Sequence, residues 1–593
     1  MAAVTSVPAE ESTTAGASQP PGAGTAEQVV PDPGPPQIIE APDGVEEAEG
    51  DEEWLIPAAR PTWQQRMKSL VPTRTADTRS AIERLRDAPP KDGPLSWLIT
   101  IVVTAMAFAI RFVGISYPKG ILFDETYYAK DAYTLLKLGY EGSWPENANE
   151  MIASGNVDVY TTNASFIVHP QLGKWLIASG EWLFGMNSFG WRFPALVFGT
   201  LLVAVTIRLA RRISRSTMVG ALAGFLLCVD GLSFVMSRIA LLDVYEAFFI
   251  AAGVLAVVLD RDWFRHRLAW DLEKKGLTGY GGRPGPFIFR PWLIVAGVLF
   301  GLACGTKWNA MFVLASFGVL CVVWSVTARR LAGAGKRSYM SLLLDGVPAF
   351  VSMVIVGIVV YVATWWSWLA TQDGWDRQWG AQHPDSWQVR FFGKPLGSLL
   401  YYHKEIWDFH NGDYIKNATH VYAAHPGGWL INARPIGIDA VNGIQAGEDG
   451  CPVGTETCLR VISATGTPTL WWFAALALLV AITWWVAGRD WRFGVPVVAA
   501  LSTYLPWFNY TERSLFFFYA ITIIPFTATC LAMVLGLVLG RADSGNRRRT
   551  GAIWVAAILS IITINFAFIY PILTDALLTQ RQWLARMWFG SWI

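Results

Sequence analysis

The stretch LSWLITIVVTAMAFAIRFVGIS, residues 95–116, decides the fold class of this chain. A helix of roughly 20 apolar residues can cross the hydrocarbon core of a bilayer, and this stretch reaches that length. Ten more apolar stretches follow, at about 192–210, 217–236, 239–259, 290–306, 308–327, 342–369, 468–487, 493–509, 514–539 and 552–573. Of the 593 residues, 53% are hydrophobic and 16% are charged. The sequence therefore predicts an all-α polytopic membrane protein with about eleven transmembrane helices.

Basic segments between these stretches indicate the orientation. They all fall on one side when the N-terminus is cytoplasmic, as the positive-inside rule requires: RLARRISRS, the linker 260–290, ARRLAGAGKR, GRDWR and GRADSGNRRR. The connections on the other side are 117–191, SRIALLD, GTKWNA, 370–467 and NYTERS. We therefore expect a multi-pass plasma-membrane protein whose chemistry is extracytoplasmic. The net charge of +1 is segregated by side, so nothing points to nucleic acid.

The same orientation divides the chain into segments. We expect a disordered acidic and Pro-rich tail (1–58), a basic juxtamembrane segment (59–94), a first transmembrane module (95–369), a cap loop (370–467) and a C-terminal transmembrane module (468–593). The outer loop 117–191 contains LGKWLIASGEWLFG, which is typical of an amphipathic helix lying along the membrane. The cap loop is rich in Trp and Tyr, which predicts a packed structure.

The sequence FDETYYAKD, residues 123–131, places two adjacent carboxylates close to the first apolar stretch. Asp124 and Glu125 could act as an acid or base at the membrane surface. Alternatively, Asp124 caps the helix that TYYAKDAYTLLKL would form, with Glu125 in its first turn.

Several cations are expected on the same outer face, where apolar helices meet water. They are Arg111, Lys174, Arg192, Arg238, Lys307 and Arg513, joined by His169. Arg111 either snorkels to the surface or lines a site. Arg238 and Asp243 could form a structural ion pair. Lys and Arg at a membrane edge are also common anchors.

Carboxylates and cations on one face suit a substrate with a phosphate head and a lipid tail. The cations would bind the phosphate, and a carboxylate would deprotonate an incoming hydroxyl. Because ATP could not supply energy on that face, we expect an activated lipid-linked donor. No nucleotide-binding loop or dense metal-ligand spacing occurs, so no cofactor and no metal site are predicted, and a divalent-metal requirement stays open. Cys451 and Cys458 favour a disulfide outside the cell.

These motifs, in this order, resemble those of the protein O-mannosyltransferases, which are GT-C type membrane glycosyltransferases, and the resemblance is closest to the actinobacterial members. The matching features are Arg111 in the first span, FDE (123–125), HPxLGK (169–174), Arg192, SRxxLLD (237–243) and RSxFFFYxxxxxP (513–525). The resemblance runs from about residue 95 to residue 573.

The resemblance implies transfer of mannose from polyprenyl-phosphate mannose to Ser or Thr of secreted proteins, with inversion at the sugar carbon. Asp124 would be the base, Glu125 a site carboxylate and Arg111 a required cation. We expect Arg192 to bind the donor phosphate, with Lys174, His169, Arg238 and Arg513 as further ligands and Asp243 and Lys307 in support. The acceptor would be an unfolded or extended polypeptide, at the Sec translocon or after it.

Two features depart from the family pattern. The long loop is too short for the β-trefoil domain of the eukaryotic members, which leaves acceptor selection open. His-Pro-Pro has become His169-Pro170-Gln171, for which we expect a change in turn rigidity only. The alternatives are a GT-C transferase acting on a lipid or cell-wall glycan, and a transporter of a lipid-linked sugar. A transporter should place its charges near the bilayer midplane rather than at the outer edge.

Overall fold

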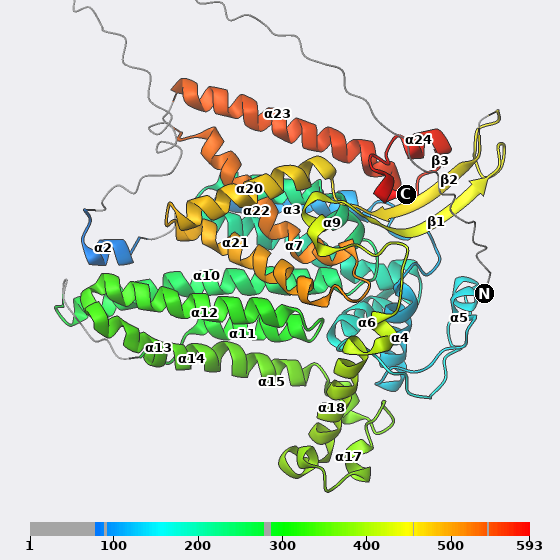
Figure 1. The fold of residues 1–593 in the computed structure, drawn as a ribbon, viewed down its shortest axis with the longest axis horizontal. Coiled ribbons are helices and arrows are strands. Elements are labelled where there is room, and N and C mark those ends of the chain that lie inside the picture. Colours follow the sequence, from blue (N-terminus) through cyan, green and yellow to red (C-terminus); the bar gives the residue numbers. More distant parts are fainter. Residues whose placement is uncertain (1–77, 88–91, 278–285, 455, 543–544) are drawn as a thin grey trace, which may run out of the picture. The chain divides into compact units, whose positions relative to one another are not determined.

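The structure, a computed structural model, describes residues 78–87, 92–277, 286–454, 456–542 and 545–593. The tail predicted at 1–58, and most of the segment 59–94, lie outside the described residues. Long helices run side by side in a bundle, and a small β-sheet lies at one end of it (Figure 1).

The helices of the first half are α2 (Ala81–Leu85), α3 (Pro94–Phe112), α4 (Glu125–Leu138), α5 (Ala148–Ala153), α6 (Leu172–Phe184), α7 (Ser188–Ser214), α8 (Thr217–Cys228), α9 (Gly231–Met236), α10 (Asp243–Lys274), α11 (Pro291–Cys304) and α12 (Ala310–Arg329). Those of the second half are α13 (Ser341–Leu344), α14 (Gly346–Phe350), α15 (Val356–Ala363), α16 (Trp366–Ala370), α17 (Trp379–Gln382), α18 (Trp387–Asn411), α19 (Asp413–Lys416), α20 (Pro468–Val486), α21 (Trp491–Tyr504), α22 (Ile524–Leu539), α23 (Gly545–Ile569) and α24 (Gln580–Leu584). Short 3-10 or π segments link several of them, among them Phe517–Thr522 before α22.

Each of the eleven predicted stretches is largely helical. In the described part of the chain, five helical segments are long and apolar enough to cross a membrane: Pro94–Phe112, Ser188–Ser214, Ala310–Ala363, Pro468–Val486 and Gly545–Leu573. The segment Ala310–Ala363 has 54 residues and contains two of the predicted spans. The structure therefore supports a multi-pass membrane protein, and the count of eleven stays a prediction.

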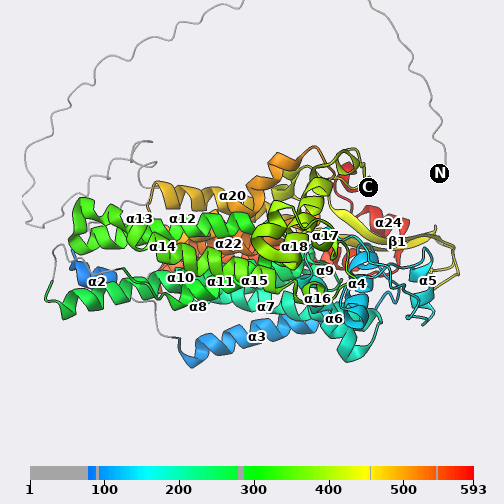
Figure 2. The same cartoon turned by 90° about the horizontal axis from the view of Figure 1, so that it is seen from below.

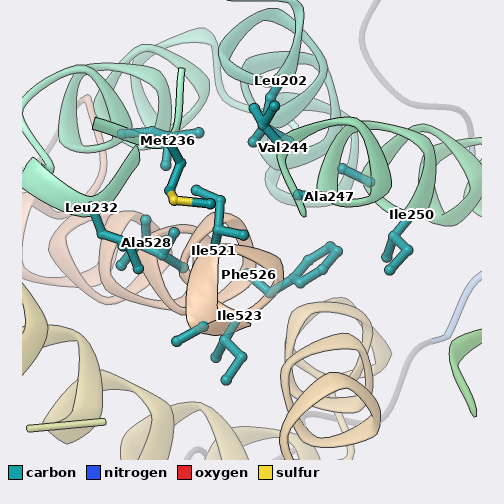
Figure 3. Close-up of a cluster of buried hydrophobic side chains, with 14 of the residues drawn as sticks. Leu202, Leu232, Met236, Val244, Ala247, Ile250, Ile521, Ile523, Phe526 and Ala528 are labelled. Carbon is teal, nitrogen blue, oxygen red and sulfur yellow. The ribbon is translucent and has the colours of Figure 1, made fainter. Parts of the chain in front are cut away.

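The centre of the bundle is a cluster of aliphatic side chains from α7, α9, α10 and α22 (Figure 3). Leu202, Met236 and Val244 are fully buried, and so is Ile521 just before α22. Close approach of α7 to α9 depends on Gly199, because an added Cβ there would lie 2.0 Å from Ser237 Oγ. This packing brings the end of α9 close to the N-terminal parts of α7 and α10.

The expectation of an all-α protein is wrong in one respect, because the described residues include an antiparallel sheet. Its strands are β1 (Ile436–Ile444), β2 (Cys458–Ala464) and β3 (Leu578–Thr579), in the order β1-β2-β3. Ile436 pairs with Ala464, and Leu459 pairs with Leu578. The strands are short, and they lie in the long loop and near the last residues of the chain. The hydrophobic pattern of the sequence is dominated by the much longer apolar helices, so it did not predict these strands.

Cys451 and Cys458 are joined by a disulfide at the tip of the β1–β2 hairpin, with their Cα atoms 5.8 Å apart. Register shifts in β1 follow Gly437 and Val441, so the ladder is irregular. The segment after β3 also contacts the cap loop, since Trp592 Nε1 donates to the carbonyl of Asn432 at 2.9 Å.

Three helices flank the sheet end of the bundle. Helix α6 packs against α4 and α7, and it forms where the amphipathic helix was predicted. Helix α4 ends at Gly139, whose φ of +82° and bond to the Leu135 carbonyl make a left-handed cap. Helix α18 runs across the direction of the bundle helices (Figures 1 and 2).

Candidate active site

The turn before α4 points Asp124 and Glu125 in different directions. Phe123 has a φ of +46°, an unusual conformation for a residue with a Cβ, and its ring packs edge-on against Phe518 at 5.8 Å. Asp124 occupies the N-cap position of α4, but its side chain makes no capping hydrogen bond. The capping alternative therefore does not explain this carboxylate.

Glu125 is completely buried and fully hydrogen-bonded. Arg192 Nε lies 2.8 Å from its Oε1, and Arg192 Nη2 lies 2.9 Å from its Oε2. The backbone N–H groups of Ala240 and Leu122 donate to the same two oxygens at 3.0 and 2.9 Å. Two-point Arg–carboxylate pairs with extra amide donors are among the strongest polar contacts in proteins. Glu125 thus joins α4, α7 and the segment between α9 and α10.

Arg192 has no free N–H group for a phosphate in this arrangement. Besides Glu125, its Nη1 donates to the carbonyls of Ile115 and Pro118, and its Nη2 donates to that of Gly120. A guanidinium has five N–H donors, and all five are used. We expected Arg192 to be the main phosphate ligand, but its contacts instead fix the segment 115–120, which precedes Asp124 in the chain.

Asp124 is half-buried beside a charged pair. Lys307 Nζ lies 2.7 Å from Asp243 Oδ1, and Asp243 Oδ2 is buried without a hydrogen-bond partner. Burial raises the pKa of Asp124 to about 6, against the opposing charge of Lys307 and with the help of Asp243. A carboxyl group with a pKa close to neutral can accept a proton and pass it on, as a general base must.

Lys307 also lines a cavity of about 110 Å³. The ionisable groups around this cavity include two cations and two imidazoles: Lys307, Arg513, His169 and His410. Other walls are apolar or aromatic: Trp308, Met311, Phe312, Trp407, Trp507 and Tyr510. Met311 and Trp407 are 43% and 51% exposed, so this apolar wall reaches the surface. The cavity suits an anionic head with an apolar tail.

Arg513 is oriented by His410. Arg513 Nη1 lies 3.1 Å from His410 Nδ1, and His410 Nε2 lies 2.9 Å from the carbonyl oxygen of Val168. Because a guanidinium can only donate, Nδ1 is the acceptor and the ring proton resides on Nε2. Burial lowers the pKa of His410, in agreement with a neutral ring. Arg513 Nε is buried without a partner, and the described residues give Arg513 no carboxylate partner.

Lys174 lies in a separate buried network. Its Nζ is 2.9 Å from Asp131 Oδ2 and 3.2 Å from Glu141 Oε1. Gln171 donates to Glu141 Oε2 at 2.8 Å and accepts from Ser367 Oγ at 3.1 Å. Gln171, which we expected to change only the rigidity of a turn, therefore links α6 to the bundle. Lys174 does not line the cavity, and its contacts do not support the predicted role as a phosphate ligand.

Arg111 and Arg238 form hydrogen bonds near the ends of helices and do not line the cavity. Arg111 neither snorkels nor lines the cavity, because it is 0% exposed and donates to Ser233 Oγ and the Leu227 carbonyl. Arg238 donates to the carbonyls of Arg111 and Gly114 at 2.7 and 3.0 Å, at the end of α3. Cations stabilise helix C-termini in this way. Arg238 and Asp243 do not pair.

Comparison with known proteins gives the family. Two protein-family models match the chain. The model described as "Dolichyl-phosphate-mannose-protein mannosyltransferase" matches residues 101–371, and the model described as "C-terminal four TMM region of protein-O-mannosyltransferase" matches residues 395–592. A "Polyprenol-phosphate-mannose--protein mannosyltransferase" of Mycobacterium tuberculosis is 34% identical over 515 residues, which cover 85% of this chain and 94% of the relative. The chain belongs to the protein O-mannosyltransferase family. The resemblance of its motifs to that family is thereby confirmed.

Two further matches agree. The protein of the same name from Corynebacterium glutamicum is 31% identical over 520 residues, covering 86% of this O-mannosyltransferase and 96% of the relative. The structure of the S. cerevisiae protein O-mannosyltransferase Pmt1-Pmt2 complex bound to the sugar donor matches with a TM-score of 0.62. That match has 12% identity and covers 88% of this chain and 97% of the yeast chain. At this identity, the yeast match shows the fold alone.

The structure brings together only part of the set of site residues predicted for this O-mannosyltransferase. His169, Lys307, Asp243 and Arg513 gather around Asp124 and the cavity. Sequence reasoning missed His410 and the ring of Tyr519, which lies 4.8 Å from Lys307 Nζ. Tyr519 lies in the quoted RSxFFFY motif, whereas no local pattern singles out His410. Within the described residues, no group of three or more His, Cys, Asp or Glu side chains could hold a metal ion.

Proposed function

We propose that this protein transfers mannose from polyprenyl-phosphate mannose to Ser or Thr hydroxyls of secreted polypeptides on the extracytoplasmic face. Its named relatives are polyprenol-phosphate-mannose–protein mannosyltransferases at 31–34% identity over most of their length. The observation that carries the proposal is Asp124: an uncommitted carboxyl group, with its pKa raised to about 6, next to a cation-lined cavity with an apolar mouth.

In this proposal the donor phosphate lies between Lys307 and Arg513. Arg513 offers a buried Nε with no partner, and Lys307 can contact a phosphate while it remains paired with Asp243. The apolar wall at Met311 and Trp407 would take the first isoprene units of the prenyl chain. Charge-assisted hydrogen bonds to phosphate are roughly twice as strong as neutral ones.

The reaction is then a single displacement at the anomeric carbon. The acceptor oxygen forms a bond to this carbon while the bond from carbon to the phosphate oxygen breaks. Polyprenyl phosphate leaves with the bonding electrons, and Asp124 takes the hydroxyl proton. Attack from the face opposite the phosphate inverts the configuration. Lys307 and Arg513 stabilise the negative charge that grows on the leaving phosphate.

An extended acceptor chain fits this geometry better than a folded one. Asp124 must come within about 3 Å of the hydroxyl, and its half-buried position at the start of α4 is accessible to a flexible segment. The assay that tests the proposal combines purified protein, polyprenyl-phosphate mannose and a Thr-rich peptide. Mannosylated peptide supports it, and transfer to lipid acceptors only would favour the GT-C alternative.

A deletion strain separates the same two possibilities in the cell. Secreted proteins should lose O-linked mannose while mannose-containing glycolipids remain. The reverse pattern would favour a lipid or cell-wall glycan acceptor. Association with the Sec translocon and a location in the plasma membrane remain part of this proposal, since the acceptors emerge at that membrane.

A further inference from the structure

A second cavity, of about 240 Å³, lies at the opposite end of the bundle from the candidate active site. It is enclosed by the C-terminal ends of α7 and α22 and the N-terminal ends of α8, α21 and α23, at the left of Figure 1. Its polar lining comprises Ser214, Ser216, Arg492 and Arg548. Its apolar lining is formed chiefly by Met218, Val219, Phe493, Met533, Leu537 and Leu539.

Of the two arginines that line the cavity, Arg492 is paired with a carboxylate, whereas Arg548 is not paired with any carboxylate in the described part of the chain. Asp490 is engaged by Arg492, whose Nε lies 2.9 Å from its Oδ1. Asp87, which also acts on Arg492, is engaged by Arg215 at 2.8 Å. Arg548 donates to the carbonyl of Gly540 at 3.3 Å and forms no ion pair within the described part of the chain. The half-buried guanidinium of Arg548 thus lines the cavity without a counter-charge from the described residues.

Hydrogen-bond donors supplement this charge. Ser216 caps α8, and its Oγ accepts from the N–H of Val219. Its hydroxyl proton is therefore free to be donated to a ligand in the cavity. Arg547 and Arg549 are exposed on the same turn of α23 as Arg548 and add to the positive potential.

The apolar wall of the cavity reaches the surface of the helix bundle. Met218 is 51% exposed and Leu537 is 41% exposed, on helices α8 and α22 of the predicted spans. The cationic groups lie at the helix ends, which is the depth of lipid headgroups in a membrane. Basic pockets between transmembrane helices at this depth bind anionic headgroups.

We propose that this cavity binds one anionic phospholipid. Its phosphate lies against Arg548, Arg492 and the Ser216 hydroxyl, and the start of an acyl chain lies along Met218 and Leu537. The site is independent of mannosyl transfer, because the two cavities are at opposite ends of the bundle. The ligand class follows from two features: a cation that forms no ion pair with the described residues, and an apolar wall exposed at the surface of the helix bundle.

The test uses the purified full chain in an uncharged detergent, titrated with phosphatidylglycerol and followed by native mass spectrometry and thermal unfolding. We expect saturable binding and a rise in Tm, with phosphatidylcholine at least tenfold weaker. Arg548→Gln should weaken phosphatidylglycerol binding at least tenfold, and Arg548→Lys should keep most of it. The matched control is Arg549→Gln, which removes an exposed charge one position away and should change binding less than twofold.

Three outcomes would overturn the proposal: equal binding of the two lipids, unchanged binding in Arg548→Gln, or an equal loss in Arg549→Gln. Glycerol 3-phosphate provides a further arm, because it has the phosphate without the acyl chains. If it binds as tightly as phosphatidylglycerol, the site is for a soluble phosphate and the lipid assignment is wrong. Mannosyl transfer to peptide, measured on each variant, shows that the protein is folded.

Discussion

Arg192 and Glu125 form a two-point ion pair in which both side chains are almost completely buried, with N–O distances of 2.8 and 2.9 Å. The pair separates the tasks of two adjacent carboxylates. Glu125 is committed to holding the turn 115–122, while its neighbour Asp124 keeps a side chain without a capping bond. We therefore expect Asp124 to take part in the reaction and Glu125 to hold the surrounding backbone in place.

Replacing the proposed base should abolish transfer without unfolding the protein. Asp124→Asn keeps the shape and loses the proton acceptor, so kcat for peptide mannosylation should fall by about 10²- to 10⁴-fold, the usual contribution of a general base. The control is Glu146→Gln, which neutralises an exposed carboxylate of the same outer loop and should leave the rate unchanged. Near-normal turnover by Asp124→Asn would show that another group takes the proton.

The pH dependence of transfer should show the raised pKa of Asp124. The base is active only when ionised, so log(kcat/KM) should fall with a slope of one as the pH drops through about 6, and level off above it. Lys307 and Asp243 are the charged groups that act on this carboxyl. Removing the cation in Lys307→Met should move the acid limb to higher pH. A limb near pH 4 in the unmodified protein would contradict the buried setting.

Breaking the Glu125–Arg192 pair should lower stability more than it changes donor affinity. Glu125→Gln leaves Arg192 buried without a counter-charge, which typically costs about 3–5 kcal/mol. Tm and kcat should both drop, whereas the donor Kd should stay within about threefold.

The control for this pair is Asp408→Asn, which breaks the exposed Lys404–Asp408 pair and should change stability by less than about 1 kcal/mol. A folded Arg192→Lys variant whose only defect is a weaker donor Kd would restore the phosphate-binding role that the sequence suggested.

Donor affinity should depend on Arg513 and on the ring that orients it. Arg513→Ala removes charge-assisted hydrogen bonds worth about 1.5–3 kcal/mol each, so the donor KM should rise about ten- to a hundredfold. His410→Gln can still accept from Arg513 and donate to Val168, and should retain far more affinity than His410→Ala. As a control, His383→Ala in the cap loop should not affect the donor KM. Equal defects in the two His410 variants would argue against this orienting role.

The disulfide of the cap hairpin should stabilise the folded protein. Cys451 and Cys458 are separated by seven positions, and closing so short a loop is worth about 2–3 kcal/mol in the chain-entropy model. The double variant Cys451→Ser/Cys458→Ser should have a lower Tm and should no longer respond to reductant. If dithiothreitol lowers the Tm of both proteins equally, the hairpin thiols are not the source.

The sequence predicted which residues face the candidate site better than it predicted their partners. Positive-inside parity placed His169, Lys307 and Arg513 on one face, and the structure groups them around one cavity. The ion pairs could not be predicted in this way. Glu125 and Arg192 are 67 positions apart, and they meet through the packing of α4 on α6 and of α6 on α7. Without the fold, every cation at that face is an equal candidate for phosphate.

The sequence also predicted the helices better than the strands. Each long apolar stretch predicted a helical segment, but some bounds were wrong. Helix α10 runs 15 residues past the predicted end at 259, and α22 begins ten residues after the predicted start at 514. Strand β2 has only seven residues, and β1 is interrupted by irregular pairing, so neither shows a regular alternation. The partner of β2 on its second side, β3, is more than a hundred residues further along the chain. Such long-range pairing leaves little local signal.

The pairing of β3 with β2 also constrains the order of events during synthesis. The hairpin can form once residue 464 has left the ribosome, but its third strand is made only when residues 578–579 follow. Contacts such as Trp592 to Asn432 come later still. The complete sheet thus forms only after helix α23 has been synthesised, because non-local contacts must wait for their partner. The nascent chain therefore lacks the third strand of the sheet until residues 578–579 have been synthesised. A chain truncated after residue 577 would never form this strand.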